Sequence, residues 1–586
     1  MTKAPLLLTQ ERGFGFTPLY NCAMRNKSID NAIAWLLLFA GPFVTIFLSM
    51  SGVTDPVNVT KMLVMVPIAF CLMGLVLTQW RDLRAKEVRV VSIVSGLVAL
   101  ALTTSVVFSS APLPQLLFGN YGRNTGFITY LSLLFIFLSA SLVRQSNFSR
   151  NLLRALMVAG VVNVLYCLIT LTWKDPLPWN NTYKNILGTL GNPDFISAFL
   201  GIIFVVCMSW LVAKSSSWRL RLFSLGTGLL AIFEAKKSHA IQGLAVAAIG
   251  IAIVGFFFVR SWISNKLATI GYSIAVGILG FMALLGALQK GPFTHFIYKT
   301  SVSLRGEYWA GAINTAKDHP IFGVGLDTYG DWYRFERRPS SIILPGPNTI
   351  VNTAHNVFLD VLASGGLFLF VAYLLLVALS VIAIIRVMRR KRQYDATFVA
   401  LTAGWIGYQA QSAVSINQIG LAIWGWLLGG ALVSYEVCTR ELQVNSQVIK
   451  PKKSKRISRF ESSSMPASSV LFGAVGGFIG LLLVLPPFMA DSRWYGALRG
   501  QKVELVQQAA LAWPMDSNRL ANAANTLAQN KFNSQALLVA REAVKFNPRS
   551  FDAWKVLSAI ETIPPSEKVN AIKRMKELDP LNTEIK

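Results

Sequence analysis

Charged side chains are scarce in this chain: they make up 14% of its 586 residues, whereas 53% of the residues are hydrophobic. This balance excludes a soluble globular domain as the main part of the chain. The apolar residues gather in runs of roughly 17–25, the length at which a helix crosses a bilayer. Thirteen such runs are centred near residues 41, 69, 99, 134, 162, 204, 227, 251, 278, 376, 404, 427 and 476. The sequence therefore predicts an all-α, polytopic membrane helix bundle of about thirteen transmembrane helices.

Cysteine and histidine are also few, at five and four residues. The cysteines fall in apolar runs or beside basic segments, so neither a disulfide framework nor a thiolate metal site is expected. The turn Gly323-Val324-Gly325 has no strand–loop–helix pattern around it, which disfavours a nucleotide-binding loop. We expect no cleaved signal peptide, because the first apolar run begins only near Ile33 and is too long for one.

The net charge of +27 comes from basic residues concentrated in alternate loops. These clusters lie near residues 12–27, 81–89, 144–154, 214–221, 260–266, 386–392 and 450–459. Cytoplasmic loops of membrane proteins carry this excess of Lys and Arg. The pattern predicts a cytoplasmic N-terminus and an outer C-terminus, in agreement with an odd number of crossings. Because the positive charge is explained by the cytoplasmic loops of a membrane protein, no nucleic-acid partner is expected.

The predicted organisation has five parts. They are a cytoplasmic lead (1–30), a membrane domain (31–437), a basic cytoplasmic linker (438–467), a last transmembrane helix (468–489) and an extracytoplasmic helical domain (490–586). Within the membrane domain, residues 289–354 form an outer loop that is too long for a simple connection and is therefore a candidate for function. Its aromatic residues, such as Trp309 and Trp332, indicate that the loop is ordered.

The C-terminal domain shows an internal repeat. Trp513-Pro514, Asn547-Pro548 and Asp579-Pro580 recur at spacings of 34 and 32, and a small or apolar residue precedes each proline by five positions. This period resembles the tetratricopeptide pattern of paired helices. It predicts a short solenoid that could bind an acceptor or a protein partner; a generic helical tail is the alternative.

All four histidines, His239, His295, His319 and His355, fall in outer loops or at the outer ends of predicted spans. Histidine is the side chain best able to accept a proton near neutral pH. His355 begins a predicted helix, whose N-terminus would keep the imidazole neutral and able to act as a base; a polar interface residue is the alternative. Asp360 lies at membrane depth, where an ionisable group is either functional or a buried structural carboxyl.

Arg305 lies on an amphipathic stretch, Ser301–Ala310, in the outer loop. Its guanidinium could bind a phosphate in a forked geometry, or it could form a salt bridge with Glu307. Tyr308 and Trp309 follow it directly.

In combination these motifs resemble the O-antigen ligase/polymerase family of bacterial membrane glycosyltransferases, which take a glycan from a polyprenyl-pyrophosphate carrier. The resemblance rests on Arg305 with Trp309, Pro320–Gly325, His355-Asn356-x-x-Leu359 and Gly366. Further matching segments are Arg123-Asn124-Thr125-Gly126, Gly191-Asn192-Pro193-Asp194, and Gln411–Asn417 leading to Trp424–Gly429. It covers roughly residues 30–437.

The resemblance implies His355 and Arg305 as catalytic residues, the first as base and the second as a cation for the leaving pyrophosphate. It implies, as substrate-binding residues, Arg123, Asn192, Lys236, Lys237, His239, Gln242, Tyr308, Trp309, Asn356 and Gln411. Many members carry Ser-Arg before the eighth span, where this chain has Ser238-His239. Lys236 or Lys237 could supply the missing charge, although Lys and Arg differ at a bidentate phosphate site.

The implied activity is inverting glycosyl transfer at the outer face of the bacterial cytoplasmic (inner) membrane. The donor would be a polyprenyl-pyrophosphate-linked glycan and the acceptor a hydroxyl of a glycan, lipid or protein. The outer segment has no carboxylate pair closer than Asp327 and Asp331, so neither a metal nor another cofactor is expected.

Several alternatives stay open from sequence. Ligase, polymerase and protein O-glycosyltransferase share the same motifs, and either His355 or His239 could be the base. A transporter or flippase of lipid-linked glycans without transferase activity is a second class. Transporters often show paired halves, which this chain lacks. A non-catalytic anchor for the repeats is a third class, but it would need one span only.

Overall fold

The computed structural model describes residues 26–85, 87–263, 265–448, 464–500 and 502–585, and every regular element among them is a helix. Most of the predicted lead (1–30) and the middle of the basic linker (438–467) lie outside the described residues. The α-helices are α1 (Lys27–Ile46), α2 (Asn58–Leu77), α3 (Arg89–Val107), α4 (Leu113–Phe118), α5 (Phe127–Leu142), α6 (Phe148–Thr172), α7 (Pro193–Val212), α8 (Trp218–Lys237), α9 (Ile241–Trp262), α10 (Lys266–Ala287), α11 (Thr294–Ile297), α12 (Thr300–Asp318), α13 (Tyr329–Glu336), α14 (Val357–Arg390), α15 (Ala396–Ser412), α16 (Ile419–Val448), α17 (Ala467–Gly500), α18 (Val503–Ala510), α19 (Ser517–Gln529), α20 (Asn533–Phe546), α21 (Phe551–Ala559) and α22 (Pro565–Leu578). Short 3-10 helices are η1 (Asp82–Arg84), η2 (Gly188–Leu190) and η3 (Pro339–Ile342).

A helix covers each of the thirteen apolar runs. Ten of the described helices are long and apolar enough to cross a membrane, which confirms a multi-pass membrane protein. The remaining three are α5 and α15, with 16 and 17 residues, and α8, which carries charged residues at both ends. Thirteen crossings therefore stay a prediction.

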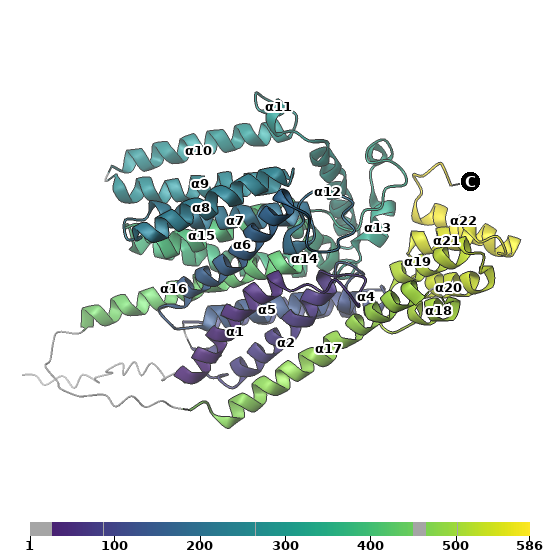
Figure 1. Cartoon of the computed structure of the whole chain (residues 1–586), viewed down its shortest axis with the longest axis horizontal. Helices are drawn as coiled ribbons and strands as arrows, with labels where there is room; N and C mark the ends of the chain where they lie inside the picture. Colours follow the sequence, from purple (N-terminus) through teal and green to yellow (C-terminus); the bar gives the residue numbers. More distant parts are fainter. Residues whose placement is uncertain (1–25, 86, 264, 449–463, 501, 586) are drawn as a thin grey trace, which may run out of the picture.

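The helices pack side by side as a bundle, with most of the loop residues 288–356 at one end (Figure 1). We call this end, which α18–α22 also flank, the outer end. We call the opposite end the basic end, because the basic clusters 144–154, 214–221, 260–266 and 386–392 lie there. The outer loop and the C-terminal helices thus share one face, as the charge pattern predicts.

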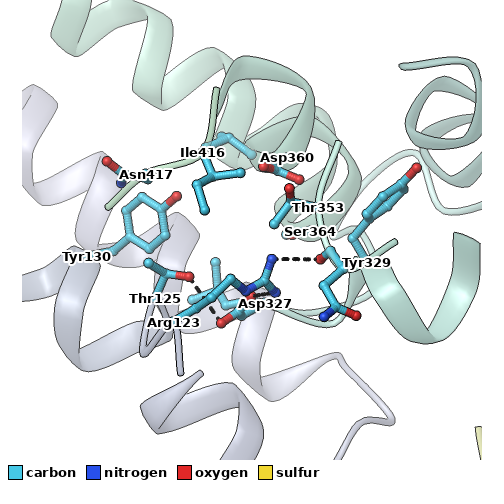
Figure 2. Close-up of a pocket in the computed structure, with 13 residues that line it drawn as sticks. Arg123, Thr125, Tyr130, Asp327, Tyr329, Thr353, Asp360, Ser364, Ile416 and Asn417 are labelled. Atoms are coloured by element: carbon cyan, nitrogen blue, oxygen red, sulfur yellow. Dashed lines mark hydrogen bonds and ion pairs between the residues drawn. The ribbon is translucent and has the colours of Figure 1, made fainter. Parts of the chain in front are cut away.

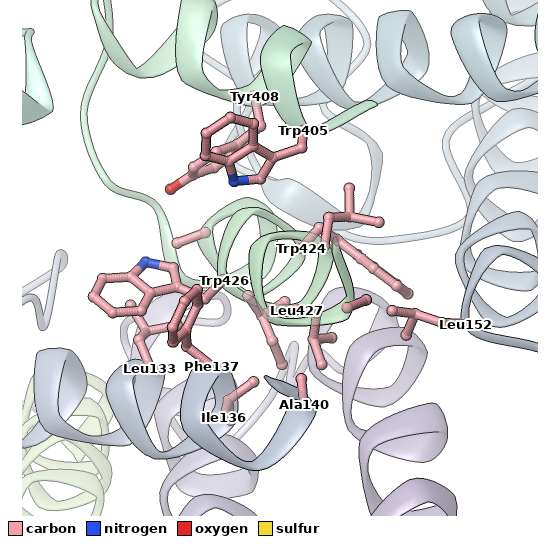
Figure 3. Close-up of a cluster of buried hydrophobic side chains, with 14 of the residues drawn as sticks. Leu133, Ile136, Phe137, Ala140, Leu152, Trp405, Tyr408, Trp424, Trp426 and Leu427 are labelled. Atoms are coloured by element: carbon pink, nitrogen blue, oxygen red, sulfur yellow. The ribbon is translucent and has the colours of Figure 1, made fainter. Parts of the chain in front are cut away.

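The core of the bundle surrounds α16, whose membrane-spanning part is completely buried. Trp424 is fully buried, and its indole Nε1 donates to Thr45 Oγ1 of α1 at 2.7 Å. Trp426 on the same helix contacts Phe137 of α5 edge-on, with ring centroids 6.4 Å apart (Figure 3). The segment Trp424–Gly429 therefore forms the centre of the bundle around which the site residues are held.

Helix α17 crosses beside α2 through glycines. A Cβ on Gly476 would stand 2.3 Å from the carbonyl oxygen of Phe70, and one on Gly74 of α2 would stand 2.2 Å from the carbonyl oxygen of Phe472. Small residues at four-residue spacing (Gly473 with Gly477, Gly476 with Gly480) allow this close backbone approach in membrane helices. The packing fixes α17, which then continues out of the bundle to the C-terminal helices (Figure 1).

The C-terminal domain contains two antiparallel helix pairs, α19–α20 and α21–α22, preceded by α18 (Figure 1). The motifs Asn547-Pro548 and Asp579-Pro580 follow α20 and α22 directly, and Trp513-Pro514 follows α18 after two residues. The small or apolar residue five positions before each proline (Ala509, Ala543, Met575) is buried. The sequence period is therefore a period of helix ends. Assignment of these pairs to the tetratricopeptide class stays a prediction.

The residue before each proline contacts the membrane domain. Trp513 packs edge-on against Phe118 at the end of α4, with ring centroids 5.8 Å apart. Asn547 Nδ2 donates to Asp331 Oδ2 on α13 at 3.1 Å. The turns after these C-terminal helices thus face α4 and this chain's own outer loop.

The third of these residues, Asp579, makes the strongest contact. Its carboxylate accepts from Arg334 at 3.0 Å and from Arg337 at 2.6 Å, and the side chains of Asp579 and Arg337 are fully buried. Both arginines belong to the outer-loop segment around α13. The C-terminal domain is therefore joined to the outer loop by a desolvated ion-pair triad.

Candidate active site

The turn Pro320–Gly325 lies against a kink in α14. Gly366 has φ +62°, and at this break the N–H of Leu367 donates to Pro320 O at 2.7 Å. The N–H of Gly325 in turn donates to Ser364 O at 2.9 Å. A kink in a membrane helix frees backbone groups that must find partners elsewhere, and the turn supplies them. A Cβ on Gly366 would stand 2.3 Å from Ile321 O, so the motifs Pro320–Gly325 and Gly366 are one structural unit.

This unit places the outer loop beside Arg123. Arg123 forms an ion pair with the buried Asp327, and its Nη1 donates to the carbonyl oxygen of Asn352 at 2.9 Å. Asp327 also accepts from the N–H of Asn120 (2.8 Å) and from Thr125 Oγ1 (3.0 Å). Burial raises the pKa of Asp327, and the Arg123 charge opposes that shift. Arg123 is therefore held in a mostly neutralised pair, with its buried Nε unpartnered within the described residues.

Figure 2 shows the pocket beside this pair. Asp360, Thr353 and Asn417 face it from the side opposite Asp327 (Figure 2). The cavity measures about 30 Å³, room for about two water molecules. Asp360 Oδ1 accepts from the N–H of Ala354 at 2.7 Å, so this carboxyl holds the backbone that leads into His355. A sugar is too large for this pocket, so a glycan would have to lie outside it.

His355 has φ +51°, in the left-handed region that costs a non-glycine residue free energy. Its N–H donates to Thr353 Oγ1 at 3.2 Å, and its ring lies 5.5 Å from the ring of Tyr308. Burial lowers the pKa of His355 to about 4, with further lowering by Arg305 and then Arg123. The imidazole is therefore neutral at physiological pH and lies within the field of both arginines.

Arg305 on α12 is mostly buried, with 13% of its side chain exposed. Its nearest carboxylate is Asp194, and the contact of 3.9 Å is longer than a hydrogen bond. Burial lowers the pKa of Arg305, while Asp194 and Tyr308 oppose the shift. Glu307, the other partner expected for Arg305, instead accepts from Ser340 Oγ at 3.0 and 2.9 Å. Compared with Arg123, Arg305 thus keeps more of its charge available for an anion.

The geometry brings together a neutral imidazole and two arginines where the outer loop enters the membrane domain. Residues 238–374 match the family model for O-antigen ligase. The matched segment contains Arg305, the Pro320–Gly325 turn, His355 and Gly366, so the match supports the resemblance on the residues that carry it. No curated protein matches the chain.

Within this ligase-like segment, Tyr308 and Trp309 belong to the wall around His355 and Arg305. The carbonyl oxygen of Tyr308 accepts from the hydroxyl of Tyr329 at 2.7 Å, which fixes α12 against α13. Trp309 is half-buried, and its Nε1 has no partner among the described residues. Tyr308 therefore positions the wall, and the indole N–H of Trp309 is a buried donor that no described residue satisfies.

Asn356 and Asn192 are both helix caps. Asn356 Oδ1 accepts from the N–H groups of Phe358 and Leu359, and Asn192 Oδ1 accepts from the N–H of Asp194 at 2.8 Å. Such caps satisfy N–H groups that the first turn leaves free. Asn192 thereby fixes Asp194 opposite Arg305, and Asn356 fixes the start of α14 next to His355.

The end of α8 and the loop that connects it to α9 carry three of the expected binding residues. Lys236, Lys237 and His239 are exposed, and His239 has φ +57°. The carbonyl oxygen of His239 accepts from Lys299 Nζ at 3.0 Å, and the charge of Lys299 acts on Asp194. Lys299, which sequence reasoning did not select, thus links this loop to the Arg305 region.

Gln242 and Gln411 are buried, and neither side-chain amide has a partner among the described residues. Gln242 lies one turn outward of Val246 on α9, and Gln411 lies one turn outward of Gly407 on α15. These two positions face each other, since a Cβ on Gly407 would stand 2.9 Å from Val246 Cγ1. The interface between α9 and α15 therefore leads to two unsatisfied amides at the outer end.

Proposed function

We propose that this chain is a bacterial membrane glycosyltransferase. It transfers or polymerises a glycan from a polyprenyl-pyrophosphate carrier onto a hydroxyl acceptor at the outer face of the cytoplasmic membrane. The observation that carries the proposal is the neutral His355, which lies within the fields of Arg305 and Arg123 inside the segment that matches O-antigen ligase.

The chemistry follows from these three side chains. The acceptor hydroxyl attacks the anomeric carbon and gives its proton to His355. The bond between that carbon and the pyrophosphate oxygen breaks, and its electron pair leaves with the pyrophosphate. Arg305 and Arg123 stabilise the charge that develops there. Because the transfer is a single displacement, it inverts the anomeric configuration. The proposed mechanism has no step that uses a metal.

Arg305 is the better of the two phosphate ligands. Arg123 is already paired with Asp327, whereas Arg305 has only the long contact to Asp194. An incoming diphosphate can replace Asp194 beside Arg305 with little loss of interaction energy, because the contact that it breaks is long. Tyr308, Trp309, Gln242 and Gln411 then line the approach for the sugar, and Lys236, Lys237 and His239 form the exposed rim.

A transfer assay with purified protein in detergent and a polyprenyl-pyrophosphate oligosaccharide tests this proposal. We expect turnover by the wild type in the presence of chelator, and about a hundredfold lower kcat in His355→Ala, the scale of a lost general base. His295→Ala is the matched control, because it changes an exposed outer-loop histidine to which the proposal assigns no role, and it should stay within about threefold of the wild type. Absence of turnover with any lipid-linked donor, in folded protein, would favour a transporter. Unchanged turnover in His355→Ala would move the base to another residue.

The pH dependence of kcat/KM and kcat should show how burial and the two nearby arginines shift the pKa of His355. In the free enzyme the pKa of His355 is lowered to about 4, so kcat/KM should be flat from pH 6 to 8 and fall only near pH 4. A bound diphosphate adds negative charge beside Arg305 and Arg123, which raises the imidazole pKa. The inflection in kcat should therefore lie at higher pH than the inflection in kcat/KM. An inflection in kcat/KM near 6.5 that persists in His239→Ala would contradict the buried position of His355.

A further inference from the structure

A second cavity, of about 1400 Å³, lies at the basic end of the bundle. It opens between α6, α8 and the connection from α14 to α15, residues 390–397. Helix α14, which has 34 residues, begins next to His355 and ends at Arg390 in the cavity wall. The cavity and the candidate active site are therefore at opposite ends of the molecule, and the proposed transfer reaction makes no use of this cavity.

One wall of the cavity carries two arginines that lack an acidic partner. Arg150 donates to Asn147 Oδ1 at 3.1 Å and Arg154 donates to Asn151 Oδ1 at 3.2 Å. Both arginines are exposed, and among the described residues neither lies within salt-bridge distance of a carboxylate. Their spacing of four residues on α6 points both side chains to the same face.

The facing wall is also basic, but its charges are partly neutralised. Arg390 pairs with Glu436 at 3.1 Å, and Lys391 pairs with Asp395 at 3.3 Å. Arg392 completes this wall. The carboxylates compensate only part of the positive charge, so the cavity as a whole is suited to an anion.

The same stripe of α6 continues as an apolar surface. Val158 and Val162 follow Arg150 and Arg154 at four-residue intervals, and Val158 is 57% exposed. Leu220 and Phe223 of α8 face them across the cavity. Positive side chains at the end of a span, followed by exposed aliphatic side chains deeper along it, match the headgroup and acyl chain of one lipid.

We propose that this cavity is a binding site for an anionic phospholipid of the adjacent leaflet. Its phosphodiester would lie between Arg150, Arg154 and the Arg390–Arg392 wall, and an acyl chain would lie along Val158 and Phe223. The volume exceeds that of most small-molecule pockets, as a lipid requires. The lipid would join α6, α8 and the α14–α15 connection, which meet around this cavity.

Native mass spectrometry of the full-length protein in detergent, titrated with phosphatidylglycerol or with phosphatidylcholine of the same chains, tests the proposal. We expect phosphatidylglycerol to bind at least tenfold more tightly. The double variant Arg150→Gln/Arg154→Gln should weaken this binding roughly tenfold or more, since each basic residue near a lipid surface contributes about 1 kcal/mol. Arg386→Gln/Arg389→Gln removes the same charge from the exposed side of α14 outside the cavity, and should bind like the wild type.

A second pair of variants tests the apolar wall without a change of charge. Val158→Trp should occupy the part of the cavity assigned to the acyl chain and lower the affinity for phosphatidylglycerol several-fold, whereas Leu165→Trp, also exposed on α6 but outside the cavity, should not. Glycerol phosphate alone should not compete at millimolar concentration. Equal binding of both lipids, or equal affinity in the arginine variants and their control, would overturn the proposal. Efficient competition by glycerol phosphate would show that the site binds a soluble phosphate and not a lipid. Tighter binding of a polyprenyl phosphate would show that its ligand is a carrier lipid and not a phospholipid.

Discussion

Arg305→Ala should lower glycan transfer about a thousandfold, mainly through kcat, the upper range for loss of one preorganised group that stabilises transition-state charge. The reason is the position of Arg305, buried beside His355 and only loosely engaged by Asp194 at 3.9 Å. The leaving pyrophosphate gains charge as the glycosidic bond breaks, so a cation next to it acts most strongly in the transition state. The measurement is initial-rate kinetics with a polyprenyl-pyrophosphate donor.

Three further variants separate this role from a structural one. Arg305→Lys keeps the charge but loses the forked donor geometry, and should recover only part of the rate. Asp194→Asn removes the ion-pair partner while Arg305 stays, and should leave kcat within about tenfold of the wild type. Lys317→Ala removes an exposed charge from the same helix and should have no effect. Equal losses in Arg305→Ala and Asp194→Asn would assign Arg305 to the stability of the loop.

Much of the architecture was accessible from sequence because membrane helices are encoded by composition. Each of the thirteen apolar runs became a helix, since a backbone in lipid must satisfy its own hydrogen bonds. The motif order was also informative: Pro320–Gly325 and Gly366, which lie forty residues apart, meet at one kink. The number of crossings was harder to establish, because α5 and α15 are short for a membrane span and α8 carries charged residues at both ends.

The partners within the site could not be read from sequence. Asp327 was considered only as half of a possible metal pair with Asp331, yet it binds Arg123, about two hundred residues earlier. Lys299 gave no signal of its own and reaches the site through the carbonyl oxygen of His239. Such contacts depend on which loops fold over each other, and spacing along the chain carries no information on that. Helix caps were easier to predict from sequence, because Asn192-Pro193 and Asn356 are typical signals for the start of a helix.

The repeat period predicted where the C-terminal helices end, but it did not predict what the residues at these ends contact. The residues before the prolines could have faced solvent or a separate protein, as solenoid turns often do. Instead Trp513, Asn547 and Asp579 all contact the membrane domain. Asn547 and Asp579 hold the α13 segment, which precedes the residues that lead to His355, so the C-terminal helices support the arrangement of the outer loop at the candidate site.

Asp579→Ala should therefore release the C-terminal domain from the outer loop. The substitution leaves Arg337, whose side chain is fully buried, without its counter-charge, and removal of one partner of a buried pair costs about 3–5 kcal/mol. Hydrogen exchange should increase in α13 and in α21–α22, while α16 in the core of the bundle stays protected. Glu584→Gln, which weakens an exposed contact to Asn348, is the matched control and should leave exchange unchanged.

The same variant connects the docking to catalysis. If the C-terminal domain holds the loop that carries Arg305, Asp579→Ala should lower kcat together with the change in exchange. The triple variant Arg334→Met/Arg337→Met/Asp579→Leu should restore both, because an apolar replacement of a whole buried ion-pair cluster is often neutral or stabilising. Restored docking without restored kcat would mean that the arginines act in the reaction themselves. Normal kcat in Asp579→Ala, with exchange increased, would assign the domain to partner or acceptor binding, separate from the geometry of the site.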